Sequence, residues 1–170
     1  MALIMRHIIS ILLQNEAGAL ARAAALFSSR GYNIESLNVA PTEHPEISRL
    51  TLVTSGSDEV IDQINKQLLK LVDVVKTADM TMDDHIEREL LLMKVRLQPG
   101  SEGVIPAIID SVGARVLDDA PETYTVELTG ASDRMDDFIT RLGACSEILA
   151  VARSGAMAIA RGHNVLGASF

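Results

Sequence analysis

A polar turn near the start of the chain carries the residue types best suited to bind a small charged molecule. Asn15 and Glu16 follow an apolar run that ends at Leu13, and Gly18 precedes a helical pattern. Backbone N–H groups at a helix start lack partners within the helix, and the helix dipole is positive there. Gly18 has no Cβ, so a ligand can approach the backbone closely. The turn therefore predicts a binding site for a small molecule with an anionic group.

Other patterns that could support catalysis or metal binding are weak. The four histidines are scattered without the spacing of metal ligands, so no metal site is expected. The charged stretch Glu87–Glu89 falls in a predicted linker, where solvation or a subunit contact is favoured over acid–base catalysis in a pocket. The single cysteine, Cys145, excludes an intramolecular disulfide and is assigned to packing. No catalytic residue is predicted.

The composition is that of a soluble globular protein with an aliphatic core. Of 170 residues 48% are apolar and only 3% aromatic, and the formal net charge is −8. Because Lys and Arg never occur in runs, neither nucleic acid nor an anionic membrane is an expected partner. No segment approaches the roughly 18 apolar residues of a membrane span, and the start lacks signal-peptide character. We expect a cytoplasmic protein, in which Met5 can be an internal translation start and Met1–Ile4 a dispensable extension.

The turn is positioned by alternating strand and helix patterns. In the first half we predict strands at 7–13, 33–40, 47–54 and 72–77, and helices at 18–30 and after an N-cap at Ser57. This βαββαβ order specifies a four-stranded antiparallel sheet with both helices on one face, because each crossover is right-handed and skips a strand position. The opposite face is left without a helix.

The second half repeats the same order at a spacing of roughly 84 residues. Strands are predicted at 90–97, 114–117, 124–129 and 148–153, and helices at 104–112 and 132–142. The fold class is therefore α+β, with two tandem ferredoxin-like βαββαβ domains at 5–78 and 90–161, a linker at 79–89 and a loose tail at 162–170. Residues 154–161 either extend the last strand or begin a short helix.

Several stretches carry a resemblance to a known family: Leu13–Leu20, Arg30–Leu37, Val39–Pro41, Lys66–Leu68, Lys70–Val74, His85–Glu89 and Ala152–Gly155. With them the chain resembles the regulatory small subunit of acetohydroxyacid synthase, also called acetolactate synthase, whose first half is an ACT domain. The first two stretches together are more specific to this family than to ACT domains in general. The similarity extends over essentially the whole chain beyond Met5.

The resemblance implies a non-catalytic subunit that binds the catalytic large subunit, raises its activity and confers feedback inhibition by a branched-chain amino acid, with valine favoured. It implies a homodimer of ACT domains with the effector between them. Thiamine diphosphate, Mg²⁺ and FAD are expected on the catalytic subunit, and no cofactor on this chain. Carried over residue by residue, the turn of one subunit supplies Asn15, Glu16, Ala17, Gly18, Ala19 and Leu20, the partner supplies Asn33 and Ile34, and Leu13 and Ala40 lie nearby.

The chemistry of these residues suits an amino acid. N–H groups of Ala17, Gly18 and Ala19 can face its carboxylate, and the Asn15 and Asn33 amides can serve either charged group. Leu13, which is apolar, favours an aliphatic ligand. The alternative is that Asn15 only caps the first helix while Gly18 eases a tight turn.

Three other functions compete with this one. A free-standing ACT sensor of another enzyme or a transcription factor is the main alternative. A small enzyme on the same fold would need a convergent nucleophile, base or metal set. An RNA-binding module would need aromatic and basic residues on the open sheet face, and neither is evident in the sequence.

Overall fold

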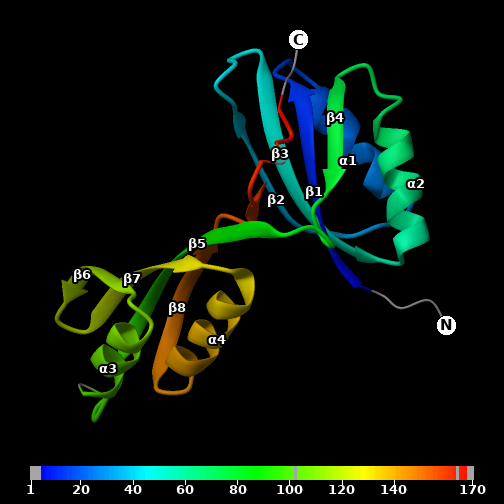
Figure 1. Ribbon diagram of the computed structural model, residues 1–170. Helices are drawn as coiled ribbons and strands as arrows, with labels where there is room; N and C mark the ends of the chain where they lie inside the picture. The colour runs from blue at the N-terminus through cyan, green and yellow to red at the C-terminus, as the bar shows by residue number, and fades with distance from the viewer. Residues whose placement is uncertain (1–4, 102, 164, 168–170) are drawn as a thin grey trace. The chain divides into compact units, whose positions relative to one another are not determined.

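The chain forms two units, which a computed structural model describes over residues 5–101, 103–163 and 165–167. The first unit comprises Met1–Ile86 with Ala156–Phe170, and the second comprises Glu87–Gly155. The chain therefore leaves the first unit once, builds the second and returns (Figure 1). The predicted dispensable extension, Met1–Ile4, lies outside the described residues.

The first unit has the predicted βαββαβ order. Its elements are β1 (Met5–Gln14), α1 (Ala19–Ser29), β2 (Ile34–Pro41), β3 (Ile47–Gly56), α2 (Asp58–Leu68) and β4 (Val74–Asp79). The strands form an antiparallel sheet in the order β2-β3-β1-β4, and both helices cover one face of it (Figure 1). Alternate residues of β1, Ile9, Ile11 and Leu13, pack there against Phe27 of α1 and Ile64 of α2.

The end of α1 shows why the helix stops where the sequence predicts. Gly31 has a φ of 73°, and its N–H donates to the carbonyl of Ser28, while the N–H of Tyr32 donates to that of Phe27. This pair of bonds is the Schellman arrangement, which needs a residue in the left-handed region. A glycine terminating helix one is thus confirmed.

The face of this sheet opposite the helices is covered by the returning C-terminal segment. A short strand, β9 (Met157–Ala160), pairs with β5 (His85–Leu97), and the N–H of Arg161 donates to the carbonyl of Asp84, just before β5. Ala156 and Ala158 are buried in a small apolar cluster, whose other buried members are Ile8, Val53 and Met80. Residues 154–161 therefore neither continue the preceding strand nor form a helix.

Hydrogen bonds hold the segment beyond β9 to the same sheet. A guanidinium nitrogen of Arg49, in β3, donates to the carbonyl of Leu166, and Lys76 Nζ, in β4, donates to that of Gly167 at 2.9 Å. At these two residues the tail, expected to be loose, is fixed to the first unit.

The second unit repeats the order with β5, α3 (Val104–Ser111), β6 (Arg115–Ala120), β7 (Thr123–Gly130), α4 (Ser132–Gly143) and β8 (Ser146–Arg153). Its strand order is β6-β7-β5-β8, again antiparallel. Met93 and Val126 of the sheet, Ile109 of α3 and Phe138 of α4 share the core, against which Cys145 packs as predicted. Two tandem ferredoxin-like folds, the predicted fold class, are confirmed.

The boundaries of the two units differ from those expected at 79–89 and at 161. Residues up to Ile86 belong to the first unit, and the second ends at Gly155. The second part of the expected linker is strand, since β5 begins at His85, and Glu89 within it is buried, 3% exposed. Its carboxylate is not solvated, since both oxygens accept hydrogen bonds from Arg153 of β8.

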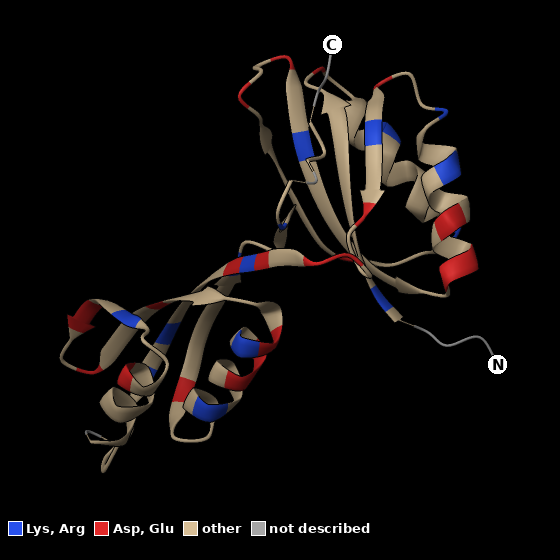
Figure 2. Cartoon of the chain, viewed as in Figure 1, with Lys and Arg blue, Asp and Glu red and all other residues tan. Residues whose placement is uncertain are grey.

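Along the described chain, basic and acidic residues alternate in position. Lys and Arg are interspersed with Asp and Glu along both units (Figure 2). None of the helices within the described part of the chain has the length and apolarity needed to cross a membrane.

Candidate functional site

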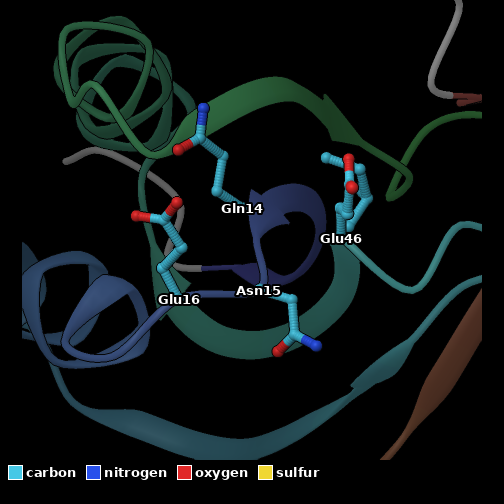
Figure 3. Close-up of a pocket in the computed structure, with 5 residues that line it drawn as sticks. Gln14, Asn15, Glu16 and Glu46 are labelled. Atoms are coloured by element: carbon cyan, nitrogen blue, oxygen red, sulfur yellow. The ribbon is translucent and has the colours of Figure 1, made fainter.

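The turn after β1 lines an open hollow of about 470 Å³, which falls within the usual range of small-molecule sites (Figure 3). Five residues line it: Gln14, Asn15, Glu16, Glu46 and Ile47. Asn15 and Glu16 were predicted from sequence, whereas the other three were missed. A signal for them existed in the predicted topology, because antiparallel pairing of β1 with β3 places the end of β1 beside the start of β3.

Backbone donors are concentrated in the turn. Within the described chain, the N–H groups of Glu16, Ala17 and Gly18 donate no hydrogen bond, whereas that of Ala19 donates to the carbonyl of Glu16 at 3.2 Å. Gly18 occupies the N-cap position with a φ of 87° and no side chain caps the helix there. Three consecutive N–H groups at a helix start can thus bind an anionic group.

Asn15 does not cap the helix. Its N–H donates to the carbonyl of Glu46 at 2.7 Å, and its side-chain Nδ2 donates to the carbonyl of Pro45 at 2.9 Å. Both bonds tie the turn to the loop before β3 instead of to α1. The helix-cap interpretation of Asn15 is therefore wrong, and its side-chain oxygen stays available as an acceptor.

Two carboxylates also border the hollow. Figure 3 shows Glu16 on the turn and Glu46 just before β3, with Gln14 between them on the end of β1. Carboxylate oxygens are strong acceptors for an ammonium group. Ala17 and Gly18 do not line the hollow itself, but they follow Glu16 directly in the same turn. The turn and the hollow together therefore offer donors for an anion and acceptors for a cation, which is the pattern that a zwitterionic amino acid requires. Among the described residues no group of three or more His, Cys, Asp or Glu side chains is placed to hold a metal ion.

Two residues expected near the site lie elsewhere. Leu13 is 2% exposed and packs in the core beneath the helices, so its side chain does not line the hollow. Ala40 lines a different hollow, together with Arg49 and Met157. Of the first predicted wall, Ala19 is buried and Leu20 is exposed.

The second predicted wall, Asn33 and Ile34, is at the opposite end of the sheet. Ile34 pairs with Thr54, which pairs with His7 at the start of β1, whereas the turn follows Gln14 at its end. Seven strand residues separate these levels, roughly 20 Å at the usual rise. Within one chain, therefore, the turn and Asn33 cannot contact the same small ligand.

Comparison with known proteins agrees with this architecture. The chain matches the family models described as "AHAS small subunit-like ACT domain" over residues 9–76 and "Small subunit of acetolactate synthase" over residues 88–162. It is 43% identical over 162 residues to the acetolactate synthase isozyme 3 small subunit of Salmonella typhimurium, covering 95% of this chain and 99% of that protein. The acetolactate synthase small subunit of Haemophilus influenzae is 44% identical over 163 residues, covering 95% and 100%.

A solved structure gives the same result for the whole fold. The crystal structure of the acetolactate synthase small subunit from Thermotoga maritima matches with a TM-score of 0.85 and 34% identity, covering 95% of this chain and 99% of that one. Both halves, their order and their lengths thus correspond to one kind of protein. This chain belongs to the family of acetolactate synthase small subunits, and its first unit is an ACT domain.

Proposed function

We propose that this chain is a non-catalytic regulatory subunit that activates the catalytic large subunit of an acetolactate synthase and makes it sensitive to a branched-chain amino acid, with valine favoured. The observation that carries the proposal is the hollow bordered by the carboxylates of Glu16 and Glu46, together with the run of N–H groups from Glu16 to Gly18 in the turn that lines it. These groups match the charged ends of a free amino acid. Thiamine diphosphate, Mg²⁺ and FAD belong, in this proposal, to the catalytic subunit.

The complete site is proposed to need two copies of the chain. β2 is an edge strand of the described sheet, in which its neighbour is β3. If two β2 strands pair antiparallel about a two-fold axis, the Ile34 end of one strand lies beside the Pro41 end of its partner. Pro41 pairs with Ser48, next to Ile47 at the hollow. The same pairing therefore brings Asn33 and Ile34 of one copy toward the turn of the other.

In this proposal, apolar contact with the effector's side chain selects an aliphatic amino acid. Ile34 is half-buried in the single chain, and in the paired arrangement it supplies an apolar surface across from the turn. Burying a valine side chain fully is worth roughly 1.5–3 kcal/mol. The remaining affinity must come from the N–H groups and carboxylates, which recognise any free amino acid, so apolar contact selects among them.

Calorimetry with valine, leucine and isoleucine tests the proposal. The wild-type chain is expected to bind valine, and Asn15→Trp or Asn33→Trp is expected to weaken binding at least tenfold, because a bulky side chain fills one wall. Gln63→Trp, at an exposed position on α2, is the matched control and should bind like the wild type.

Mixing the two variants tests whether the site is shared. Random exchange of Asn15→Trp and Asn33→Trp chains makes half of the dimers mixed, and each mixed dimer has one intact and one doubly altered site, so about a quarter of all sites should recover. No recovery in a mixture shown to exchange would contradict a site built from two copies. Absence of heat with all three amino acids would contradict the effector proposal itself.

Co-purification tests whether the partner of this chain is the catalytic subunit of an acetolactate synthase. Tagged chain expressed in its own host should retain a thiamine-diphosphate-dependent catalytic subunit, and adding the purified chain should raise that subunit's activity. Retention of a different enzyme or of a transcription factor, without effect on acetolactate formation, would favour the free-standing sensor instead.

A further inference from the structure

An ion pair next to the turn connects its two ends to one buried residue. Arg22, in the second turn of α1, donates from Nε to Asp73 Oδ2 at 2.6 Å and from Nη2 to Asp73 Oδ1 at 2.8 Å. This is the two-pronged geometry that fixes a guanidinium in both position and plane. The Asp73 side chain is 4% exposed, whereas that of Arg22 is 49% exposed. Neither residue lines the hollow.

Asp73 also holds the other end of the turn through its backbone. Its carbonyl accepts the N–H of Gln14, the last residue of β1, at 2.8 Å. On the far side of the turn, the N–H of Arg22 donates to the carbonyl of Gly18 at 2.9 Å. The turn is thus spanned by two connections that both lead to Asp73.

The Arg22 guanidinium lies directly over Gly18. A Cβ placed on Gly18 would be 2.6 Å from Arg22 Nη1, so a side chain there would have to displace the guanidinium. The φ of 87° favours glycine independently of that contact. The pair is also charged at neutral pH, since the hydrogen bonds from Arg22 hold the pKa of the Asp73 carboxyl below its usual value. The guanidinium therefore covers one side of the turn in a fixed orientation.

We infer that the Arg22–Asp73 pair is a positioning device for the effector site: it orders the turn so that the N–H groups of Glu16 to Gly18 converge on one anionic group. The inference rests on the proposed function, because the effector gives that ordering its purpose. An unrestrained turn has to lose conformational entropy when a ligand binds, and this loss weakens affinity. A turn ordered beforehand avoids that loss.

The pair of variants Arg22→Gln and Asp73→Asn separates positioning from direct contact. If Arg22 acts by ordering the turn, both variants weaken valine binding by about tenfold, and the double variant binds no more weakly than either single variant, because the two side chains act as one unit. If Arg22 instead binds the effector's carboxylate directly, Asp73→Asn leaves a free guanidinium and binding stays at the wild-type level or improves. That second result would overturn the inference.

Hydrogen exchange gives a readout that needs no ligand. Without effector, the backbone amides at positions 19 and 22 should exchange faster in both variants, while core amides of β1 and β3 keep their wild-type protection. Arg96→Gln is the matched control, since it removes an exposed arginine–carboxylate pair, with Glu147, in the second unit. Unchanged exchange at the turn in both variants would overturn the inference, whether or not the wild-type chain binds an amino acid. Absence of amino-acid binding to the wild-type chain would instead contradict the proposed function.

Discussion

Arg153→Met is expected to destabilise the second unit by about 3 kcal/mol, because it leaves a buried carboxylate without its charged partner. Arg153 donates to both oxygens of Glu89, from Nε at 2.7 Å and from Nη2 at 2.8 Å. Its remaining terminal nitrogen donates to Asp136 Oδ1 at 2.6 Å. The Glu89 side chain is only 4% exposed, so water cannot replace these bonds, and the hydroxyl of Ser132 is one neutral donor.

The two tyrosines allow each unit to be followed separately in the full chain. Tyr32 packs against the core of the first unit and Tyr124 against that of the second, and the chain has no tryptophan. In a Tyr32→Phe background, urea unfolding monitored by tyrosine fluorescence therefore reports the second unit. Arg96→Met is the control, because its pair with Glu147 is about half exposed and should contribute less than about 1 kcal/mol. Equal, small losses in the two variants would contradict the role given to Arg153.

Acid should reduce the difference between wild type and Arg153→Met. Hydrogen bonds from Arg153, and then from Ser132, lower the pKa of the Glu89 carboxyl in the folded chain. A depressed folded pKa contributes stability that is complete above the unfolded value, about 4.3 for Glu, and is lost as the pH falls toward the folded value. The two urea curves should therefore approach each other below about pH 4.

The same pair shows where local sequence patterns fail. Residues 79–89 carry five acids with little periodicity, which favours a solvated linker. Glu89 is nevertheless a buried strand residue. The arginine that pairs with it, Arg153, is 64 positions further along the chain. Hydrophobic alternation is a local signal and predicted the order of helices and strands, whereas a pairing between distant charged residues leaves no such signal.

The residues of the candidate site also divide into those that a local sequence pattern could predict and those that it could not. Asn15, Glu16 and Gly18 could be found from the change of pattern at the end of β1. Alternation would also have assigned Leu13 to the core, since Ile9, Ile11 and Leu13 share the helix-covered face of β1. Asn33 comes from the family resemblance alone, because no property of its own sequence neighbourhood connects it with a turn at the opposite end of the sheet.

The C-terminal strand β9 is too short, and its buried side chains are too small, for hydrophobic alternation to predict it. Ala156 and Ala158 are buried, whereas Met157 and Ile159 are exposed, which is strand alternation over only four residues. In this stretch the larger apolar residues face outward and the alanines face inward. Hydrophobicity alone would therefore assign Met157 and Ile159, and not the alanines, to the buried face of the strand. For that reason the packing of Ala156 and Ala158 with Ile8 could not be predicted.

This inverted pattern gives a sharp prediction: Ala158→Asp is expected to destabilise the first unit by about 3 kcal/mol, whereas Ile159→Asp should change its stability by less than about 0.5 kcal/mol. Ala158 is 5% exposed and lies in the apolar cluster with Ile8 and Val53, so an aspartate there would be a buried charge without a partner. Ile159, its neighbour, is 58% exposed.

Urea unfolding in a Tyr124→Phe background, where Tyr32 reports the first unit, measures the two effects. The chain has one way to avoid burying the aspartate, which is to release β9 and the segment after it from the sheet. Release would expose Ile8, Val53 and Met80 and break the bonds that Arg49 and Lys76 donate to the tail. Increased hydrogen exchange at Ile8 with a smaller loss of stability would identify that response. Equal losses for Ala158→Asp and Ile159→Asp, with unchanged exchange, would contradict the covering of this face by the C-terminal segment, because a larger loss is expected only where the new carboxylate is buried.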